Sequence, residues 1–458
     1  MSKEAIKYLR SNRRRYLETL KTFLTIPSIS TQSEHKADMQ SAAAWLVETM
    51  TSFGLAQAKL HPTPGHPIVY GEWLGAGPTA PTVLIYGHYD VQPPDPLDQW
   101  NSPPFEPTVR GEDLFARGAT DDKGQLFTHL AAVDALLKTE GKLPLNVKFL
   151  IEGEEEIGGL NLDRFIADNL SLLNADCALI SDSPFVGRGQ PAIVYGLRGM
   201  VQFELQARSA GHDLHSGAYG GVVHNPINAL AKIIAAMHNE NNGITIPGFY
   251  DDVLPLNESE RVMLEKLPEA FLEETGARKL WGEAQFTARE RVGVRPTFDV
   301  HGIVGGYTDE GQKTVIPAAA TAKVSLRLVP NQDPHKVTDQ FTQYVRSLTP
   351  DTISLEVVRQ SWGYPALIDR NDPAITAASK AYEQAFKTKP LFAREGGSIP
   401  VVATLQHLLN LPVAMMGFGL PDDNLHAPNE KFHLPNFYRG AEAGIHFMAH
   451  YARLKAEH

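Results

Sequence analysis

Apolar residues recur at helical spacing at the start of the chain and then give way to short apolar runs. The helical spacing predicts helices over 4–24 and 37–53, separated near Pro27. The short runs have the length of buried strands, and the helical stretches 125–137 and 161–173 fall between some of them. We predict strands at 68–74, 82–86, 147–151, 178–180 and 192–195. This alternation predicts an α/β domain whose mixed, largely parallel sheet is flanked by helices.

A different pattern begins near Gly199. Residues 201–207 alternate between apolar and polar, as in a half-exposed strand, and a helical stretch follows at 226–237. A second unit of this kind comprises 322–329, 334–348 and 353–358. The α/β rhythm then resumes with helices at 374–386, 401–409 and 435–454 and a strand at 412–416. We therefore expect a first domain over 1–197 and 363–458, interrupted by a smaller α+β domain over 198–362.

The segment 241–297 is polar and carries one helical stretch near 258–274, so it predicts an elaboration of the inserted domain without defining its structure.

The chain has 458 residues, of which 43% are hydrophobic and 21% charged, the balance of an ordinary globular protein.

The formal net charge is -11, which repels nucleic-acid phosphates and anionic lipid surfaces, so we expect neither partner. The one cysteine, Cys177, excludes an internal disulfide and a thiolate metal cluster. The first residues are charged and lack the apolar core of a signal peptide, so we expect a cytoplasmic protein. The basic run 13–15 lies in a helical stretch and is typical of a solvated helix face.

Chemically active side chains follow several predicted strands. The strand 82–86 leads into His88 and Asp90, and residues two apart in an extended chain point to the same side. A carboxylate in contact with an imidazole fixes the orientation of a metal ligand, although a His at a strand end is often incidental.

Carboxylates crowd two other segments. Asp121 and Asp122 lie in a glycine-flanked turn before a helix, where an Asp is often only an N-cap. The strand 147–151 is followed by Glu152 and by three further glutamates at 154–156, which form either a solvated loop or part of a cleft at the strand end. Carboxylates packed this closely repel one another unless cations offset their charge.

Asp182 and His426 follow two more predicted strands, so five strand ends converge on two histidines and three carboxylates. Imidazole and carboxylate ligands without thiolates suit zinc, manganese or cobalt. The count is right for two metal ions that share one bridging carboxylate. The spacing alone leaves open which glutamate of 154–156 serves as a ligand.

These motifs resemble the dinuclear metallopeptidase family that includes carnosinase, cytosolic nonspecific dipeptidase, aminoacylase and succinyl-diaminopimelate desuccinylase. The resemblance extends from His88 to Glu430. It is nearest to the carnosinase-like dipeptidase branch, through the segments 116–124, 213–217, 305–307, 326–332 and 396–400. It implies a catalytic domain, interrupted by a lid and dimerisation domain, and a cis peptide between Asp121 and Asp122.

The resemblance also implies a role for each residue of the centre. His88 and Asp182 would bind one metal ion, Glu156 and His426 the other, and Asp121 would bridge the two ions. Two divalent ions per subunit are expected, zinc before manganese. Asp90 would orient His88, and Glu155 would be the general base that activates a metal-bridging hydroxide.

The inserted domain would complete the site. The resemblance implies that His215 donates to the developing oxyanion, often from the neighbouring subunit, so we expect a homodimer. Arg327 and Ser398 would hold the substrate carboxylate, with Asn225 assisting, although a strand arginine often makes only a salt bridge. A histidine in a glycine-rich loop is, likewise, often a surface residue.

The sequence therefore predicts a metal-dependent dipeptidase that hydrolyses dipeptides or very short peptides with a free C-terminal carboxylate. One alternative is an amidohydrolase, a deacylase or desuccinylase that acts on N-acyl amino acids with the same metals. An alternative of another class is a dimeric binding protein without catalytic activity.

Overall fold

The computed structural model describes residues 2–159 and 161–456. The chain divides into two compact units. Unit 1 comprises Met1–Tyr195, Ile368–Ala393 and Thr404–His458, and unit 2 comprises Gly196–Leu367 and Arg394–Ala403. The domain boundaries expected from the sequence, 1–197, 198–362 and 363–458, stay a prediction.

Unit 1 is built on a mixed sheet in the order β1-β2-β6-β3-β7-β17-β8. Its four central strands, β6, β3, β7 and β17, are parallel, whereas β1, β2 and β8 run antiparallel to their neighbours. The strands are β1 (Ala56–His61), β2 (Ile68–Trp73), β3 (Thr82–His88), β6 (Asn146–Glu152), β7 (Cys177–Ile180), β8 (Ala192–Leu197) and β17 (Val413–Met415). The parallel centre confirms the fold class expected from the short apolar runs.

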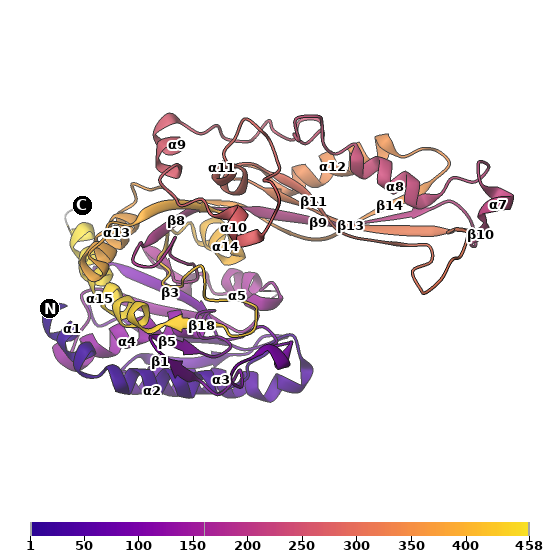
Figure 1. Ribbon diagram of the computed structural model, residues 1–458. Coiled ribbons are helices and arrows are strands. Elements are labelled where there is room, and N and C mark those ends of the chain that lie inside the picture. The colour runs from indigo at the N-terminus through magenta and orange to yellow at the C-terminus, as the bar shows by residue number, and fades with distance from the viewer. Residues whose placement is uncertain (1, 160, 457–458) are drawn as a thin grey trace. The chain divides into compact units, whose positions relative to one another are not determined.

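Helices cover this sheet in layers, as Figure 1 shows. The helices α3, α4 and α13 pack directly on strands, and α15 packs on α4 and α13. The helices of this unit are α1 (Ser2–Ser11), α2 (Arg13–Leu24), α3 (Lys36–Ser52), α4 (Lys123–Glu140), α5 (Leu162–Asp168), α6 (Leu170–Leu173), α13 (Pro373–Phe386) and α15 (Leu434–Ala456). The strands of the parallel centre are buried on both faces, except at Thr82, the half-buried first residue of β3.

Two predicted helices are interrupted at an asparagine, which corrects the sequence-based expectation. The stretch 4–24 forms two helices that meet at Asn12, and the stretch 161–173 forms two that meet at Asn169. In both places the asparagine Nδ2 donates to the carbonyl four residues earlier, at 2.9 Å. An asparagine side chain competes in this way with the helical backbone pattern, and an apolar periodicity does not record it.

A small sheet that the apolar pattern did not reveal joins distant parts of unit 1. It has the order β18-β5-β4, and its strands are β4 (Thr108–Arg110), β5 (Asp113–Phe115) and β18 (Lys431–His433). Each strand has only three residues, too few to show an alternation in the sequence. The pairing holds the segment before Asp121 beside the segment after His426.

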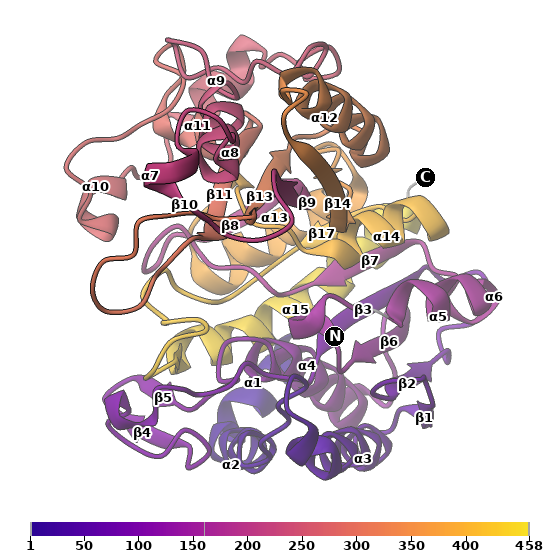
Figure 2. The same ribbon diagram turned by 90° about the vertical axis from the view of Figure 1, so that its right-hand side faces the viewer.

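Unit 2 contains an antiparallel sheet in the order β11-β13-β9-β14. The helices α8 (Pro226–Ala235) and α12 (Pro334–Leu348) pack against it, as Figure 2 shows. The strands are β9 (Gly199–Arg208), β11 (Thr297–Gly305), β13 (Ala319–Leu328) and β14 (Ser354–Gly363). The inward residues of β9, from Val201 to Ala207, join both helices in one apolar core. This strand-and-helix composition agrees with the expected smaller α+β unit, although β11 was missed because most of its residues are exposed.

The remaining elements of unit 2 and of the passages between the units are short. The helical stretch expected near 258–274 is divided, because Pro268 lies between α9 and α10 and cannot continue a helix. These elements are β10 (Leu214–His215), α7 (Ser216–Tyr219), α9 (Glu258–Leu264), α10 (Phe271–Thr275), α11 (Ala288–Gly293), β12 (Val315–Ile316), β15 (Ala366–Leu367), β16 (Leu391–Glu395) and α14 (Pro400–Leu409).

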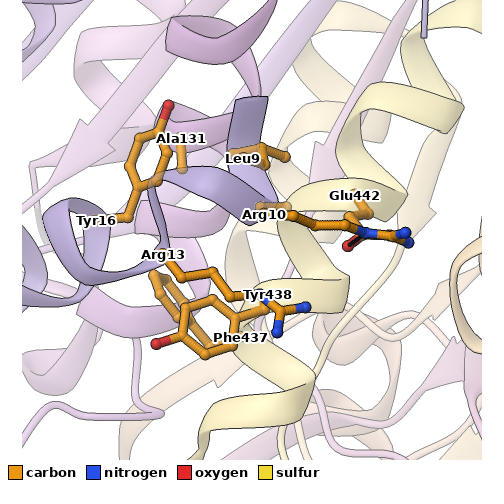
Figure 3. Close-up of a pocket in the computed structure, with 9 residues that line it drawn as sticks. Leu9, Arg10, Arg13, Tyr16, Ala131, Phe437, Tyr438 and Glu442 are labelled. Carbon is orange, nitrogen blue, oxygen red and sulfur yellow. Dashed lines mark hydrogen bonds and ion pairs between the residues drawn. The ribbon is translucent and has the colours of Figure 1, made fainter. Parts of the chain in front are cut away.

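The first two helices are fastened to the last helix around a small pocket, shown in Figure 3. Arg10 forms an ion pair with Glu442, with Nε 2.8 Å from Oε1, and the guanidinium of Arg13 lies 4.8 Å from the ring centroid of Tyr438. These contacts give part of the basic N-terminal stretch a structural role on the surface of unit 1.

A buried histidine links helix α4 to the carboxyl ends of the central strands β7 and β17. His129, on α4, donates from Nε2 to Oγ of Ser181 at 2.6 Å, and Ser181 donates onward to the carbonyl of Met416. Burial lowers the pKa of His129 to about 3 from its ordinary 6.5, because a charged imidazole would be desolvated there. The folded protein therefore holds this ring neutral.

This depressed pKa makes the fold sensitive to acid. Below about pH 6.5 the unfolded chain binds a proton at His129 that the folded chain rejects, so stability falls as the pH drops toward about 3. We expect the loss of unfolding free energy between about pH 7.5 and about pH 5 to be about 2 kcal/mol smaller in His129→Gln. Urea denaturation of metal-free protein measures it, with His212→Gln, at an exposed position, as the control. Equal acid dependence in His129→Gln and wild type would contradict the assignment.

Candidate metal centre

His88 is the last residue of β3, and its buried imidazole is held in place by Asp90. Its Nδ1 lies 3.1 Å from the backbone carbonyl oxygen of Asp90 and 3.3 Å from Asp90 Oδ1. With Nδ1 as the donor, the ring turns its unprotonated Nε2 away from Asp90 and into the centre. Asp90 thus lies where the sequence places it, beside the imidazole that it is expected to orient.

Asp121 ends the glycine-flanked turn that leads into α4. The Asp121–Asp122 peptide is cis, as the family resemblance implies. Asp122 occupies the N-cap position, but its side chain makes no capping hydrogen bond to the helix. Its Oδ2 instead accepts from the backbone N–H of His88 at 3.3 Å. The N-cap explanation for this acidic pair therefore does not account for either side chain.

The acidic turn after β6 is held by hydrogen bonds from two directions. Asp90 accepts from the backbone N–H groups of Glu155 at 3.3 Å and Glu156 at 3.1 Å. Glu154 faces elsewhere, since its carboxylate accepts from Asn161 Nδ2 at 2.8 Å and from the His66 backbone at 3.0 Å. These bonds set Glu154 apart from Glu155 and Glu156, which the spacing alone could not do.

Five side chains from separate segments meet in two groups that share Asp121. One group contains His88, Asp121 and Asp182, and the other contains Asp121, Glu156 and His426. Within each group the candidate ligand atoms lie within 4.8 Å of one another. The structure therefore brings all five predicted ligands together, and their roles as ligands stay a prediction.

The shared carboxylate faces one histidine with each oxygen. Asp121 Oδ1 lies 3.0 Å from His88 Nε2, and Oδ2 lies 2.9 Å from His426 Nε2. On the outer sides, Asp182 Oδ2 is 4.0 Å from His88 Nε2, and Glu156 Oε2 is 3.4 Å from His426 Nε2. This is the geometry of a bridging carboxylate between two terminal pairs of ligands.

The donor set fits divalent cations on two counts. Among the described residues, the buried Nε2 of His88 makes no hydrogen bond that meets the geometric criteria, although Asp121 Oδ1 lies 3.0 Å away. Burial, together with repulsion from neighbouring carboxylates, raises the pKa of Glu155 and Glu156 to about 8 and that of Asp182 to about 6. Cations placed between these groups would remove both penalties.

The residues expected to bind the substrate, His215, Asn225 and Arg327 of the inserted domain and Ser398 of the stretch 363–458, all lie in unit 2. Arg327 Nη1 donates to Ser398 Oγ at 3.0 Å, so these two expected partners are in contact. The exposed His215 precedes α7, and its Nδ1 accepts from the Gly217 backbone at 3.0 Å. Asn225 caps α8 by accepting from the Ile227 backbone at 2.9 Å, a structural role that needs no substrate.

Sequence reasoning missed three residues that shape these sites. Gln92 Nε2 donates to Glu156 Oε2 at 2.8 Å. Arg198, mostly buried, lies close enough to Arg327 for the two charges to repel, and this repulsion adds to the effect of burial in lowering the pKa of Arg198 to about 10. Glu430 accepts from the turn that carries Asp121. Gln92 lies four residues after His88, and Glu430 lies four residues after His426. This closeness in the sequence to predicted ligands was the signal that could have indicated both residues.

A parallel-centred α/β unit with carboxylates and imidazoles gathered at its strand ends is the architecture of a metal-dependent hydrolase. A family model for peptidase family M20/M25/M40 matches residues 84–450. The chain belongs to this peptidase family.

Relatives of known activity match along almost the whole chain. The Cys-Gly metallodipeptidase DUG1 of Candida albicans is 31% identical over 96% of this chain and 95% of its own length. The Beta-Ala-His dipeptidase of Homo sapiens is 30% identical over 98% of this chain and 93% of its own length. Both are named as dipeptidases, which agrees with the branch that the sequence motifs indicate.

Solved structures agree with the fold. An M20 family metallo-carboxypeptidase, Sso-CP2 from Sulfolobus solfataricus, has a TM-score of 0.87 and 34% identity, and covers 96% of this chain and 99% of its own. Human carnosine dipeptidase 1 has a TM-score of 0.82 and 29% identity, and covers 99% of each chain.

In the described part of the chain, no helix is both long and apolar enough to cross a membrane.

Proposed function

We propose that this protein hydrolyses the peptide bond of dipeptides, or of very short peptides with a free C-terminal carboxylate, with two divalent metal ions, zinc before manganese. The observation that carries the proposal is the pair of ligand groups joined by Asp121. The dipeptidase names of the full-length relatives support the substrate class. His88 and Asp182 would hold one ion, and Glu156 and His426 the other.

Two divalent ions supply Lewis acidity and lower the pKa of a bound water toward neutrality. The chain's own residues do the rest. Asp90 fixes the ring of His88 and the backbone of Glu155 at once, so that the proposed ligand and the proposed base keep one relative position. The Glu155 carboxylate takes a proton from water and returns it to the leaving amine. Its pKa, raised by burial, favours that return.

The groups of unit 2 would recognise the substrate. Arg327 offers a guanidinium that can bind a carboxylate through two parallel hydrogen bonds, and Ser398 holds its Nη1 in place. The exposed His215 would donate to the developing oxyanion in the active site of a second subunit. The proposed functional assembly is therefore a homodimer.

Metal removal and a substrate panel test this function directly. After prolonged chelation we expect hydrolysis of every panel member to disappear, because the developing charge on the carbonyl oxygen would lose its stabilisation. Zinc or manganese should restore it, and dipeptides should then be cleaved faster than tripeptides or N-acyl amino acids. Activity in a demonstrably metal-free sample would contradict the mechanism. Faster cleavage of tripeptides would indicate a carboxypeptidase, and faster cleavage of N-acyl amino acids an amidohydrolase.

Glu155→Gln should lose about 10²-fold or more in kcat, because an amide cannot take the proton from water. Elemental analysis should find the same metal content as in the wild type. Glu106→Gln, at an exposed position, controls for the loss of one negative charge. Near-normal turnover would remove Glu155 from the role of general base.

His215→Ala should lower kcat by about 10²-fold or more, as expected for a lost oxyanion donor, with metal content intact. If His215 acts across the dimer, heterodimers of this variant with Glu155→Gln regain one complete active site. Mixed, verified heterodimers should then recover up to half of the wild-type activity. Heterodimers as inactive as the two parent variants would place His215 in its own subunit's site.

A further inference from the structure

Glu430 is a fully buried carboxylate, and its side chain accepts hydrogen bonds from the turn that ends at Asp121. Both of its oxygens are used. Oε2 accepts from Arg117 Nη1 at 2.8 Å and from the Gly118 backbone N–H at 2.9 Å. Oε1 accepts from the backbone N–H groups of Thr120 at 3.0 Å and Asp121 at 3.1 Å. Four donors from five consecutive residues therefore converge on one side chain.

The backbone around Glu430 is fixed to the same turn. The Ala116 N–H donates to the Glu430 carbonyl at 3.1 Å, and Thr120 Oγ1 donates to the Lys431 carbonyl at 2.7 Å. The β5–β18 pairing continues this contact toward Phe115. Since His426 lies four residues before Glu430, one short segment carries both His426 and the anchor of Asp121.

We propose that Glu430 is a positioning residue that fixes the backbone of Asp121, so that this carboxylate directs one oxygen toward each half of the metal centre. The inference rests on the proposed dinuclear function. Asp121 belongs to both ligand groups, so a rotation of its backbone would disturb both at once. Residues that hold ligands from behind change metal affinity by about 10–100-fold when they are replaced.

A glutamine at position 430 would retain the volume but not the hydrogen bonds. An amide has one oxygen and one NH₂ group, whereas all four neighbours of Glu430 are donors. In either orientation the NH₂ group would face two N–H donors and repel them. One orientation sets the NH₂ group against the Thr120 and Asp121 N–H groups, and the other sets it against Arg117 Nη1 and the Gly118 N–H. In both orientations the buried guanidinium of Arg117 loses its anion.

The chain offers a matched control in Asp134, another fully buried carboxylate of unit 1. It pairs with Arg15 and accepts from Tyr16 Oη at 2.7 Å, and neither partner belongs to the metal centre. Asp134→Asn removes a buried anion next to an arginine, as Glu430→Gln does. It therefore reports what the loss of a buried carboxylate does to the fold alone, with a partner arginine that is more exposed than Arg117.

The test measures the Zn²⁺ affinity of the full-length protein by competition with a chromophoric chelator. We expect both variants to unfold at lower urea concentration, but only Glu430→Gln to lose about 10–100-fold in affinity at both ions. Glu430→Asp keeps the charge but has a shorter side chain, so its Zn²⁺ affinity should lie between those of the wild type and Glu430→Gln. If Glu430→Gln does not fold, Glu430→Asp replaces it in the test. Wild-type affinity in the Glu430 variants, or an equal loss in Asp134→Asn, would overturn the inference.

The result also separates this inference from the proposed function. If the wild-type protein binds two Zn²⁺ ions and cleaves dipeptides while the Glu430 variants bind zinc normally, only the role of Glu430 fails. If the wild-type protein itself binds no Zn²⁺, the proposed function fails and the positioning role falls with it.

Discussion

The repulsion among buried carboxylates is the constraint on which this structure depends. Unit 1 gathers Asp121, Glu155, Glu156 and Asp182 where water is largely excluded, and burial is the largest cause of the raised pKa of Glu155, Glu156 and Asp182. Such a cluster is costly unless positive charge compensates it. The histidines of the centre supply part of that positive charge. The acidic turns are held in place by their own backbone N–H groups, which donate to Asp90 and Glu430.

Hydrogen bonds from backbone N–H groups fix the positions of the clustered carboxylates. Asp90 gathers the amides of the acidic turn, and Glu430 gathers those of the turn before α4. Both residues are acceptors only, and each links two segments that are distant in the sequence. The positions of the ligand atoms therefore depend on hydrogen bonds made by the residues that hold the ligand segments. Hydrogen bonds of this kind fix the orientation of ligands at metal sites generally.

Much of this could be predicted from the sequence, for identifiable reasons. Buried parallel strands read as uninterrupted apolar runs, so β3, β6 and β7 were found, and the side chains at their ends were found with them. The turn glutamates could not be told apart, because their separation depends on contacts to Asp90, His66 and Asn161. Helix breaks at Asn12 and Asn169, and the small sheet around β18, depend on hydrogen bonds that leave no apolar period.

The position of β17 in the sheet also sets the order in which the molecule can be assembled during synthesis. This strand, Val413–Met415, lies between β7 and β8, which are more than two hundred residues earlier in the chain. A ribosome must therefore release nearly the entire polypeptide before the α/β layer can close. His426 and β18 emerge later still, so a partly made chain lacks both the second imidazole of the centre and Glu430, the anchor of the Asp121 turn.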